Sequence, residues 1–432
     1  MVCWRKYLMT RKMKDSGVEW IGEIPEHWKI LRGKNVLNLL KRPVEDGSEV
    51  ITCFRDGQVT LRSNRREDGF TFSDKEIGYQ GILKGDLVIH GMDGFAGAIG
   101  ISDSNGKGSP VLNVCLPKDN SFGVYIKYYL RMLASQNVFI ALATGIRERS
   151  CDLRWNKIAN LEFIVPPIKE QEDISMFLDK KCSAIDKLIS NKEKVIEKLK
   201  EYKQSIITEA VTKGLNPDVK MKDSGVEWIG DIPEHWNITP LKYTVEYNKY
   251  NLSEKTEDDL NISYIDIGSV TNEEGIKEIQ YFDFKNAPSR ARRIVKTGDT
   301  IISTVRTYLK AIAYISDEYN NFICSTGFAV CTPKDCYIDK YMFYCLHAEW
   351  FVSIVESISV GISYPAINTT NLMNLKNIVP PIQEQREIVD YLNQKCLAID
   401  KLITNKEKVI EKLTEYKKSL IYECVTGKRE VQ

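Results

Sequence analysis

The sequence predicts an α+β protein: two mixed α/β domains joined by two long helices that form an antiparallel coiled coil with pseudo-two-fold symmetry. Three observations lead to this fold class. A run of 31 residues that begins at Cys182 returns at Cys396 with 24 identical positions. A polar run of 17 residues that begins at Lys14 returns at Lys222 with 15 identical positions. Two longer, distantly similar blocks lie between these copies, so we expect two halves built on one plan.

The two 31-residue runs have the period of a coiled coil, because apolar residues recur at alternating spacings of three and four. Neither contains Gly or Pro, and helix-forming residues fill the remaining positions. Two helices of nearly one sequence are expected to pack on each other. The predicted seam is Ile185, Leu188, Lys192, Val195, Leu199, Tyr202 and Ile206 in the first helix, and Ile399, Leu402, Lys406, Val409, Leu413, Tyr416 and Leu420 in the second.

Lys192 and Lys406 place a charge at equivalent positions of this seam. A charged residue in an apolar seam can fix the register of the two helices. A long lysine stem can also lie along the seam while its ammonium reaches water. The sequence does not decide between these two interpretations.

Composition and punctuation divide the chain into six segments. Pro166 and Pro167 precede the first helical region, and Gly214 and Pro217 follow it. Whether the helix is continuous from Pro167 stays open, as does the choice of Met1 or Met9 as the start. The expected segments are residues 1–30 (first repeat), 31–165 (first domain), 166–214 (helical), 215–238 (linker and second repeat), 239–379 (second domain) and 380–432 (helical).

The two blocks between the repeats are mixed in character. The first contains short β-like runs at 50–54, 86–90, 98–102 and 111–116, separated by turn residues, and then a helical stretch at about 124–143. KGDLVIH in the first block corresponds to TGDTIIS in the second. Because the repeats are nearly identical and the blocks are not, we expect two different recognition domains on one repeated frame.

Charge, cysteines and missing motifs narrow the function. A formal charge of +1 gives no global attraction for polyanions, and no apolar stretch reaches the 18 residues of a membrane span. Eleven cysteines without a CxxC pattern are expected to be reduced in the cytoplasm. The sequence has no GxxxxGK[ST] phosphate loop. Its Pro-Pro pairs follow Val instead of Asp or Asn, so they do not form the Asn/Asp-Pro-Pro-aromatic loop that holds a flipped adenine in methyltransferases. Its four histidines are dispersed. We expect no catalytic site, no cofactor and no metal.

Several segments together resemble the specificity subunit of type I restriction–modification systems. They are IVPPIKEQ and IVPPIQEQ, the two WIG-IPEHW segments, and AIDKLI-NKEKVIEKL, which occurs twice. The resemblance covers essentially the whole chain from Lys14. It implies a non-catalytic subunit that reads an asymmetric split DNA target through two target-recognition domains. It also implies docking of two methyltransferase subunits and, in the full complex, restriction subunits. S-adenosylmethionine and ATP with Mg²⁺ are expected only on those partners.

Local basic clusters are then the candidate DNA contacts, because guanidinium groups bind phosphate and read guanine. Any single arginine could instead be a solvated loop charge. The DNA interpretation depends on the set, since clusters occur in both blocks. The candidates are Arg62, Arg65, Arg66, Arg147, Arg149 and Arg154 in the first block, and Arg290, Arg292, Arg293, Arg306, Ser363 and Tyr364 in the second.

Two other classes of function stay open at this point. A scaffold with two protein-binding heads would need the same helices but no DNA, and a self-sufficient enzyme would need motifs that the sequence lacks. The geometry favours DNA. A helix of about 30 residues spans roughly 45 Å, and one turn of duplex DNA is ~34–36 Å, so two readers on such a spacer suit a bipartite target.

Overall fold

The computed structural model describes residues 11–65, 77–119, 121–142 and 153–431. The chain divides into two compact units. Unit 1 comprises Met1–Lys192 and Glu407–Gln432, and unit 2 comprises Glu193–Lys406. Each unit holds one β-rich domain and a part of each long helix, as the α+β fold class predicts. The division passes through both helices, so the predicted limits of the six segments stay predictions.

Unit 1 is built around an antiparallel four-stranded sheet in the order β4-β11-β8-β9. The helix α2 contacts strand β9 of this sheet, and Tyr125, Tyr129 and Leu133 of α2 are buried. The elements of the unit, before the long helices, are β1 Met13–Asp15, β2 Glu23–Pro25, β3 Lys29–Arg32, α1 Gly33–Val36, β4 Leu37–Leu39, β5 Ile51–Cys53, β6 Val59–Leu61, η1 Arg62–Asn64, β7 Gln80–Ile82, β8 Leu87–His90, η2 Gly94–Ala96, β9 Ile99–Ile101, β10 Gly106–Gly108, β11 Leu112–Pro117, α2 Gly123–Ser135, α3 Val138–Ala141, α4 Trp155–Asn160 and β12 Glu162–Val165.

Unit 2 repeats this plan and adds a second sheet. Its sheet β16-β25-β22-β23 matches the sheet of unit 1 strand for strand, while β20-β17-β24-β21 is an addition with one parallel pair. Its elements are β13 Met221–Asp223, β14 Asp231–Pro233, β15 Asn237–Pro240, α6 Leu241–Thr244, β16 Val245–Tyr247, β17 Asn261–Ile265, η4 Ile267–Ser269, β18 Val270–Thr271, β19 Gly275–Ile276, β20 Gln280–Asp283, η5 Phe284–Asn286, β21 Ala291–Ile294, β22 Thr300–Ser303, η6 Thr307–Leu309, β23 Ile312–Tyr314, η7 Asp317–Tyr319, β24 Ile323–Ser325, β25 Phe328–Pro333, α7 Asp339–His347, α8 Glu349–Ser357, α9 Thr369–Asn374 and β26 Lys376–Val379.

The internal correspondence seen in the sequence is therefore structural. KGDLVIH supplies β8 and TGDTIIS supplies β22, which hold the same place in matching sheets. The β-like runs of the first block form β5, β8, β9 and β11 within a residue or two of their predicted ends. The single helical stretch expected at about 124–143 is instead two helices, α2 and α3. They are separated at Asn137, whose φ of 59° is left-handed and interrupts the helical geometry.

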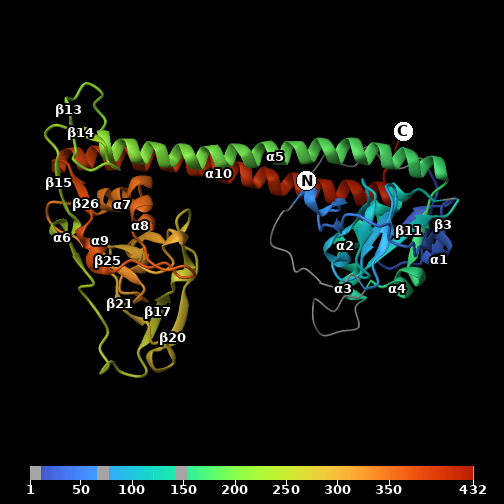
Figure 1. Ribbon diagram of the computed structural model, residues 1–432, viewed down its shortest axis with the longest axis horizontal. Helices are drawn as coiled ribbons and strands as arrows, with labels where there is room; N and C mark the ends of the chain where they lie inside the picture. The colour runs from blue at the N-terminus through green and yellow to red at the C-terminus, as the bar shows by residue number, and fades with distance from the viewer. Residues whose placement is uncertain (1–10, 66–76, 120, 143–152, 432) are drawn as a thin grey trace. The chain divides into compact units, whose positions relative to one another are not determined.

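The two long helices are each continuous. α5 runs from Ile168 to Lys213 and α10 from Ile382 to Val425, so the question left open at Pro167 is resolved in favour of one helix. Within each unit they lie side by side and run antiparallel (Figure 1). In unit 2, Lys203 Nζ lies 2.8 Å from both carboxylate oxygens of Asp400. In unit 1, Lys417 Nζ lies 2.6 Å from both oxygens of Asp186.

In each long helix, three of the seven predicted seam positions are wrong, and the seam residue is the next one in the sequence. Leu188, Val195 and Tyr202 are 50%, 41% and 56% exposed, and their copies Leu402, Val409 and Tyr416 are exposed as well. The buried or half-buried side chains are those that follow them in sequence. The structure thus gives the seam as Ile185, Ile189, Lys192, Ile196, Leu199, Lys203 and Ile206 in α5, and Ile399, Ile403, Lys406, Ile410, Leu413, Lys417 and Leu420 in α10.

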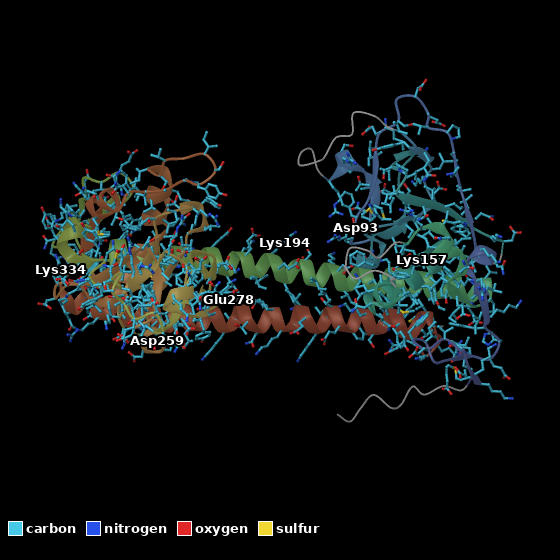
Figure 2. All side chains as sticks on the ribbon, turned by 90° about the horizontal axis from the view of Figure 1, so that it is seen from below. Asp93, Lys157, Lys194, Asp259, Glu278 and Lys334 are labelled. Atoms are coloured by element: carbon cyan, nitrogen blue, oxygen red, sulfur yellow. The ribbon has the colours of Figure 1, made fainter. Side chains whose placement is uncertain are left out.

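The cause of this error is visible in the sequence. Positions 188 and 189 are both apolar, as are 195 and 196, so two neighbouring stripes satisfy the same spacing. At 202 and 203, the third such pair, the sequence favours the aromatic Tyr202 over the charged Lys203 as the buried seam residue. The partner helix reverses that choice, because Lys203 finds the carboxylate of Asp400. Lys192 and Lys406 are half-buried at their predicted positions. Figure 2 shows Lys194 among the exposed charged side chains that project from α5.

The repeated polar segments attach each domain to the first turn of a long helix. In unit 1, Trp28 Nε1 donates to Glu170 Oε2 at 3.0 Å, and His27 Nε2 lies 2.7 Å from Glu170 Oε1. In unit 2, Trp236 and His235 make the same contacts with Glu384 at 2.9 and 2.7 Å. The IPEHW and PPI-EQ motifs are therefore two halves of one junction, which the chain builds twice.

The glutamine of each PPI-EQ motif completes the junction. Gln385 is fully buried; its Oε1 accepts from Ile338 N, and its Nε2 donates to the carbonyl oxygens of Cys336 and Pro380. Gln171 binds Phe122 N and Pro166 O in the same way. Each glutamine thus holds the residue at the N-terminal end of a domain helix, α7 or α2. Domain and long helix are therefore fixed to each other within each unit.

A paired substitution tests the corrected seam. Ile403 is 9% exposed and Leu402 is 50% exposed. Ile403→Ala should lower the free energy of unfolding by about 2–4 kcal/mol, because it removes a buried side chain and leaves a cavity. Leu402→Ala, its neighbour on the exposed flank, should lower it by less than about 1 kcal/mol. Chemical denaturation of both variants gives the comparison, and a larger loss for Leu402→Ala would restore the seam first predicted.

Candidate nucleic-acid interface

Two loops of unit 2 are locked together at the end of β22. The chain leaves Ser303 and passes through Thr304, whose amide donates to Gly327 O at 2.8 Å. The amide of Ile367 donates to Thr304 O at 2.9 Å, and Thr307 Oγ1 lies 2.8 Å from Ser359 Oγ. The last two bonds connect residues 304–307 with residues 359–367. The second loop is the segment in which the sequence analysis placed Ser363 and Tyr364.

Arg306 has an unusual backbone in this frame. Its φ of 53° and ψ of 49° are left-handed, a conformation that costs a non-glycine residue roughly 1 kcal/mol or more. The neighbouring hydrogen bonds hold this conformation, and the side chain is exposed. The guanidinium carbon lies 4.9 Å from the centre of the Tyr364 ring. Backbone strain and stacking together fix a guanidinium at a solvent-facing position.

A cavity of about 450 Å³ opens beside this stack. Three of the predicted contacts, Arg290, Arg306 and Tyr364, line it together, although they come from distant parts of the sequence. Asp266 also lines it, and this carboxylate accepts from Tyr264 Oη at 2.9 Å and from Gly268 N at 3.2 Å. Burial is the main cause that raises the pKa of Tyr264 to about 12. The tyrosine is therefore a neutral donor that orients Asp266.

The other predicted residues of unit 2 are placed unevenly around this cavity. Arg292 lies over the Phe284 ring at 4.7 Å and donates to Ala291 O. Arg293 is only half-exposed, and its Nη1 is buried without a hydrogen-bond partner among the described residues. Desolvation by burial lowers the pKa of Arg293. Because its Nη1 atom is shielded from solvent, Arg293 is less accessible to a ligand than Arg306, whose side chain is exposed.

The loop that carries Tyr364 has an apolar tip. Ser363 is exposed, as predicted for a contact residue, and Ile362 beside it is 103% exposed. The bridge between Val360 and Ala366 closes the base of this loop. Ile362 and Asp266 were not predicted from the sequence, because an isoleucine is usually a core residue and a lone aspartate is usually a turn residue. The unusual run of Gly, Ile, Ser and Tyr before Pro365 was the available signal.

Unit 1 arranges its predicted residues differently. Arg65 donates to Asp56 at 2.7 Å and lies over the Phe54 ring at 4.2 Å. Arg62 Nε donates to Thr52 Oγ1 at 3.3 Å. Arg154 is exposed at the start of α4. Arg66, Arg147 and Arg149 lie outside the described residues. The structure therefore places Arg62 and Arg65 in the segment directly after β6, and Arg154 at the start of α4.

At the end of β8, in the place that Ser303 holds in unit 2, unit 1 has His90. Its Nδ1 accepts from the amides of Met92 and Asp93 at 3.2 and 2.9 Å. Burial is the main cause that lowers the pKa of His90. The ring is thus a neutral acceptor that shapes the 91–97 loop. Its role is structural, and it is joined there by the ion pair between Arg55 and Asp93 at 2.8 Å.

The side chains at these surfaces are suited to binding a ligand. Stacked guanidinium groups suit bidentate contacts to phosphate or to the O6 and N7 atoms of guanine. Within the described ranges, no group of three or more His, Cys, Asp or Glu side chains could hold a metal ion. In the same ranges no helix combines the length and apolar character that crossing a bilayer requires.

Comparisons with known proteins agree with this picture. The family described as the type I restriction modification DNA specificity domain matches residues 233–414. The specificity subunit of the type I restriction enzyme MjaVIII of Methanocaldococcus jannaschii is 24% identical over 423 residues, covering 95% of this chain and 94% of its own. The putative MjaX specificity subunit of the same organism is 25% identical, with 95% and 96% covered.

A solved structure shares the fold. It comes from work on complex assembly and conformational transition of the type I restriction–modification system. Its TM-score is 0.70 at 15% identity, and it covers 94% of this chain and 99% of the other. Over 95% of its length the chain is thus similar to specificity subunits of type I restriction enzymes, and residues 233–414 match the DNA specificity domain of these systems.

Proposed function

We propose that this chain is a non-catalytic specificity subunit of a type I restriction–modification system. It would read a bipartite, asymmetric DNA target, with one half-site read by the β-rich domain of each unit. The observation that carries the proposal is the cavity of unit 2, where Arg290, Arg306 and Tyr364 converge. The matching sheets of the two units support one reading position per unit. The candidate residues of the two units support two different half-sites. Unit 1 presents Arg62 and Arg65 after β6, whereas unit 2 presents Arg306 after β22 stacked on Tyr364 of the loop after α8.

Arg306 and Tyr364 are well suited to reading DNA. A guanidinium that is already stacked and held loses less side-chain entropy on binding than a free arginine. The apolar tip at Ile362 could contact a thymine methyl group or the sugar edge without introducing a charge. Arg290 supplies a second cation on the same wall. We therefore assign base or phosphate contacts to Arg306, Arg290 and Tyr364 before Arg292, and we do not assign one to Arg293.

The exposed flank of the long helices is the proposed docking face for two methyltransferase subunits. Unit 1 exposes Leu188, Val409 and Tyr416, and unit 2 exposes their copies. The copies in unit 2 are Leu402, Val195 and Tyr202. Apolar residues that recur every seven positions form a stripe on which another amphipathic helix can pack. Two equal stripes, one per unit, suit two copies of one partner.

The partners would bring the chemistry. S-adenosylmethionine would be bound by the methyltransferase subunits, and ATP with Mg²⁺ by the restriction subunits that join the full complex. This chain would determine only which DNA sequence is bound and how far apart the two half-sites lie. We expect the assembly to work in the cytoplasm, where the cell's DNA is.

Arg306→Gly separates recognition from stability. Glycine adopts the left-handed backbone without strain, so the variant should keep its free energy of unfolding within about 1 kcal/mol of the parent. It should lose the guanidinium contact and weaken duplex binding by about 1–3 kcal/mol, the size of one good base contact. Calorimetric unfolding and duplex binding at fixed salt measure the two quantities. Unchanged duplex affinity would remove Arg306 from the interface.

Two matched variants control this test. Arg306→Ala should bind duplex DNA as weakly as the glycine variant but be less stable, because alanine keeps the backbone strain. Lys376→Ala removes an exposed positive charge on β26, outside the lining of the cavity. It should change duplex affinity little, and an equal loss there would point to general charge attraction in place of a specific contact.

The docking face predicts a change in stoichiometry. The double substitution Val195→Ser and Tyr202→Ser removes most of the exposed apolar stripe that α5 offers in unit 2. The variant should retain one methyltransferase subunit instead of two, as measured by the mass of the purified complex. Lys194→Ser with Glu201→Ser, exposed neighbours on the same helix, should retain both. Two bound subunits in the Val195 and Tyr202 variant would contradict this assignment.

A further inference from the structure

The two junctions that join domain and helix differ at the position of Arg11. The polar repeats align Lys14 with Lys222, which sets Arg11 of unit 1 against Val219 of unit 2. The residues around this position are otherwise closely matched: Pro25 and Pro233, His27 and His235, Trp28 and Trp236, and Glu170 and Glu384. The two units therefore offer an internal comparison of the same site with and without an arginine.

In unit 1 the guanidinium of Arg11 is inserted into the junction. Arg11 Nη1 donates to Glu170 Oε2 at 3.2 Å. Its Nη2 donates to the carbonyl oxygens of Gly427 and Arg429 at 3.3 and 3.4 Å, just beyond the end of α10. Its guanidinium carbon lies 5.7 Å from the centre of the Trp28 ring. One guanidinium thus connects the start of α5, the end of α10 and the repeated segment.

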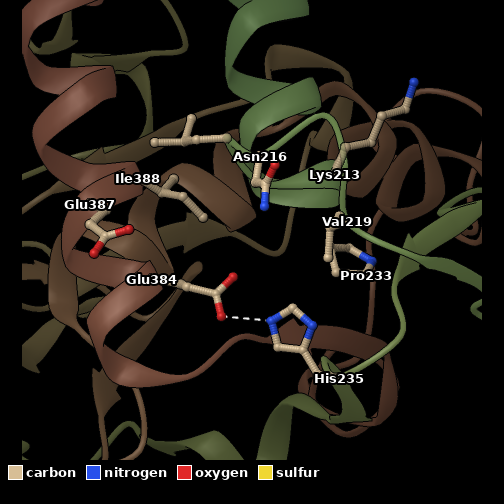
Figure 3. Close-up of a pocket in the computed structure, with 10 residues that line it drawn as sticks. Lys213, Asn216, Val219, Pro233, His235, Glu384, Glu387 and Ile388 are labelled. Carbon is tan, nitrogen blue, oxygen red and sulfur yellow. Dashed lines mark hydrogen bonds and ion pairs between the residues drawn. The ribbon is translucent and has the colours of Figure 1, made fainter.

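In unit 2 the corresponding place is an open cavity of about 380 Å³. Figure 3 shows Glu384 and Glu387 on one side of it, with His235 and Pro233 on another, and Val219 in the place of the arginine. The chain that leaves α5 forms the remaining wall. The full lining is Lys213, Gly214, Leu215, Asn216, Val219, Pro233, His235, Glu384, Glu387 and Ile388.

The walls of the two sites are built alike. Gly214 and Gly427 both have left-handed backbones, with φ of 73° and 72°. A Cβ atom added to Gly214 would lie 3.1 Å from the ring of Trp236, and one added to Gly427 would lie 2.9 Å from the ring of Trp28. The chain therefore leaves the end of α5 in unit 2 through the same left-handed glycine turn by which it leaves the end of α10 in unit 1. The turn brings residues 214–216 to the cavity wall.

The acceptors around the cavity suit a guanidinium. Glu384 accepts from Trp236 Nε1 and lies 2.7 Å from His235 Nε2, which uses about half of the lone-pair positions of a carboxylate. Glu387 adds a second carboxylate, although its Oε1 already accepts from Gln383 Nε2 at 2.9 Å. Planar guanidinium groups match carboxylate and carbonyl acceptors better than a compact ammonium does. Unit 1 demonstrates that match with Arg11.

We propose that this cavity of unit 2 is a binding site for a guanidinium group, supplied either by a small molecule or by an arginine of a bound methyltransferase subunit. The second source rests on the proposed function, and the first does not. Both would complete the junction of unit 2 with the contact that Arg11 makes within unit 1.

The tryptophan indole groups report on the site directly. Ethylguanidine is titrated into the full chain labelled with ¹⁵N-tryptophan, with ethylamine as the matched ammonium control. Ethylguanidine should shift the Trp236 indole signal saturably at millimolar concentration and leave the Trp28 signal in place. Ethylamine should bind at least several-fold more weakly. No saturable shift, or equal shifts with both compounds, would overturn the proposal.

Exchanging the residues between the two units provides the decisive controls. Val219→Arg should fill the cavity, abolish the ethylguanidine response and raise Tm by about 2 °C. Arg11→Val should open the equivalent site, so that ethylguanidine shifts both indole signals. If Val219→Arg does not fold, Glu387→Gln, an exposed change, should weaken ethylguanidine binding several-fold. An unchanged response in the variants that fold would exclude this cavity as the site.

Assembly with the methyltransferase subunit distinguishes the two sources. If a partner's arginine fills the cavity, Val219→Arg should weaken attachment of one subunit at least tenfold, and ethylguanidine should compete with it. If a small molecule fills it, Val219→Arg should leave attachment unchanged, while the parent chain keeps its ethylguanidine response. The titration needs no partner. A failure of assembly alone would therefore count against the proposed function and leave the binding site tested on its own.

Discussion

Each domain is held on its long helix by the carboxylate of a glutamate in the helix's first turn. Glu170 and Glu384 each receive an indole N–H and lie against a histidine ring nitrogen, all within 3.0 Å. The next residue, a buried glutamine, binds the backbone at the start of a domain helix. The bonds of the tryptophans and glutamines are partly or fully buried, so losing one of their partners would leave polar groups unsatisfied at a cost of about 1–3 kcal/mol each. The position of each β-rich domain relative to its part of the helices depends on this junction.

The same constraint explains why the repeats are so alike while the domains diverge. The junction and the seam each need particular partners, so their residues recur almost unchanged in both halves. The loops that carry the candidate contact residues, after β6 in unit 1 and after β22 and α8 in unit 2, carry no such requirement and differ in sequence. In unit 2 they hold a strained arginine on a tyrosine. In unit 1 they hold arginines that are paired with or stacked on neighbours, such as Arg65 with Asp56 and Phe54. A constant frame with variable loops suits a protein whose loops determine what it binds.

Much of the fold could be predicted from the sequence, because repetition and periodicity are visible in it. The two helices, their antiparallel packing and the matching of KGDLVIH with TGDTIIS all follow from local patterns. The choice between Leu188 and Ile189 as seam residues could not be made, since both satisfy the spacing and only the facing helix decides between them. Nor could the sequence show that Arg293 points into its domain while Arg306 and Tyr364 meet, because residues almost 60 positions apart are brought together by hydrogen bonds between loops.

We propose that two unlike domains on one repeated frame read two separate half-sites. A map of methylated adenines in cells that produce this chain with the methyltransferase subunit proposed to bind it tests the claim most directly. We expect a motif of two short, different sequence blocks separated by a constant number of unspecified bases. A single uninterrupted motif, a palindromic pair of identical blocks, or methylation without a fixed gap would contradict the account.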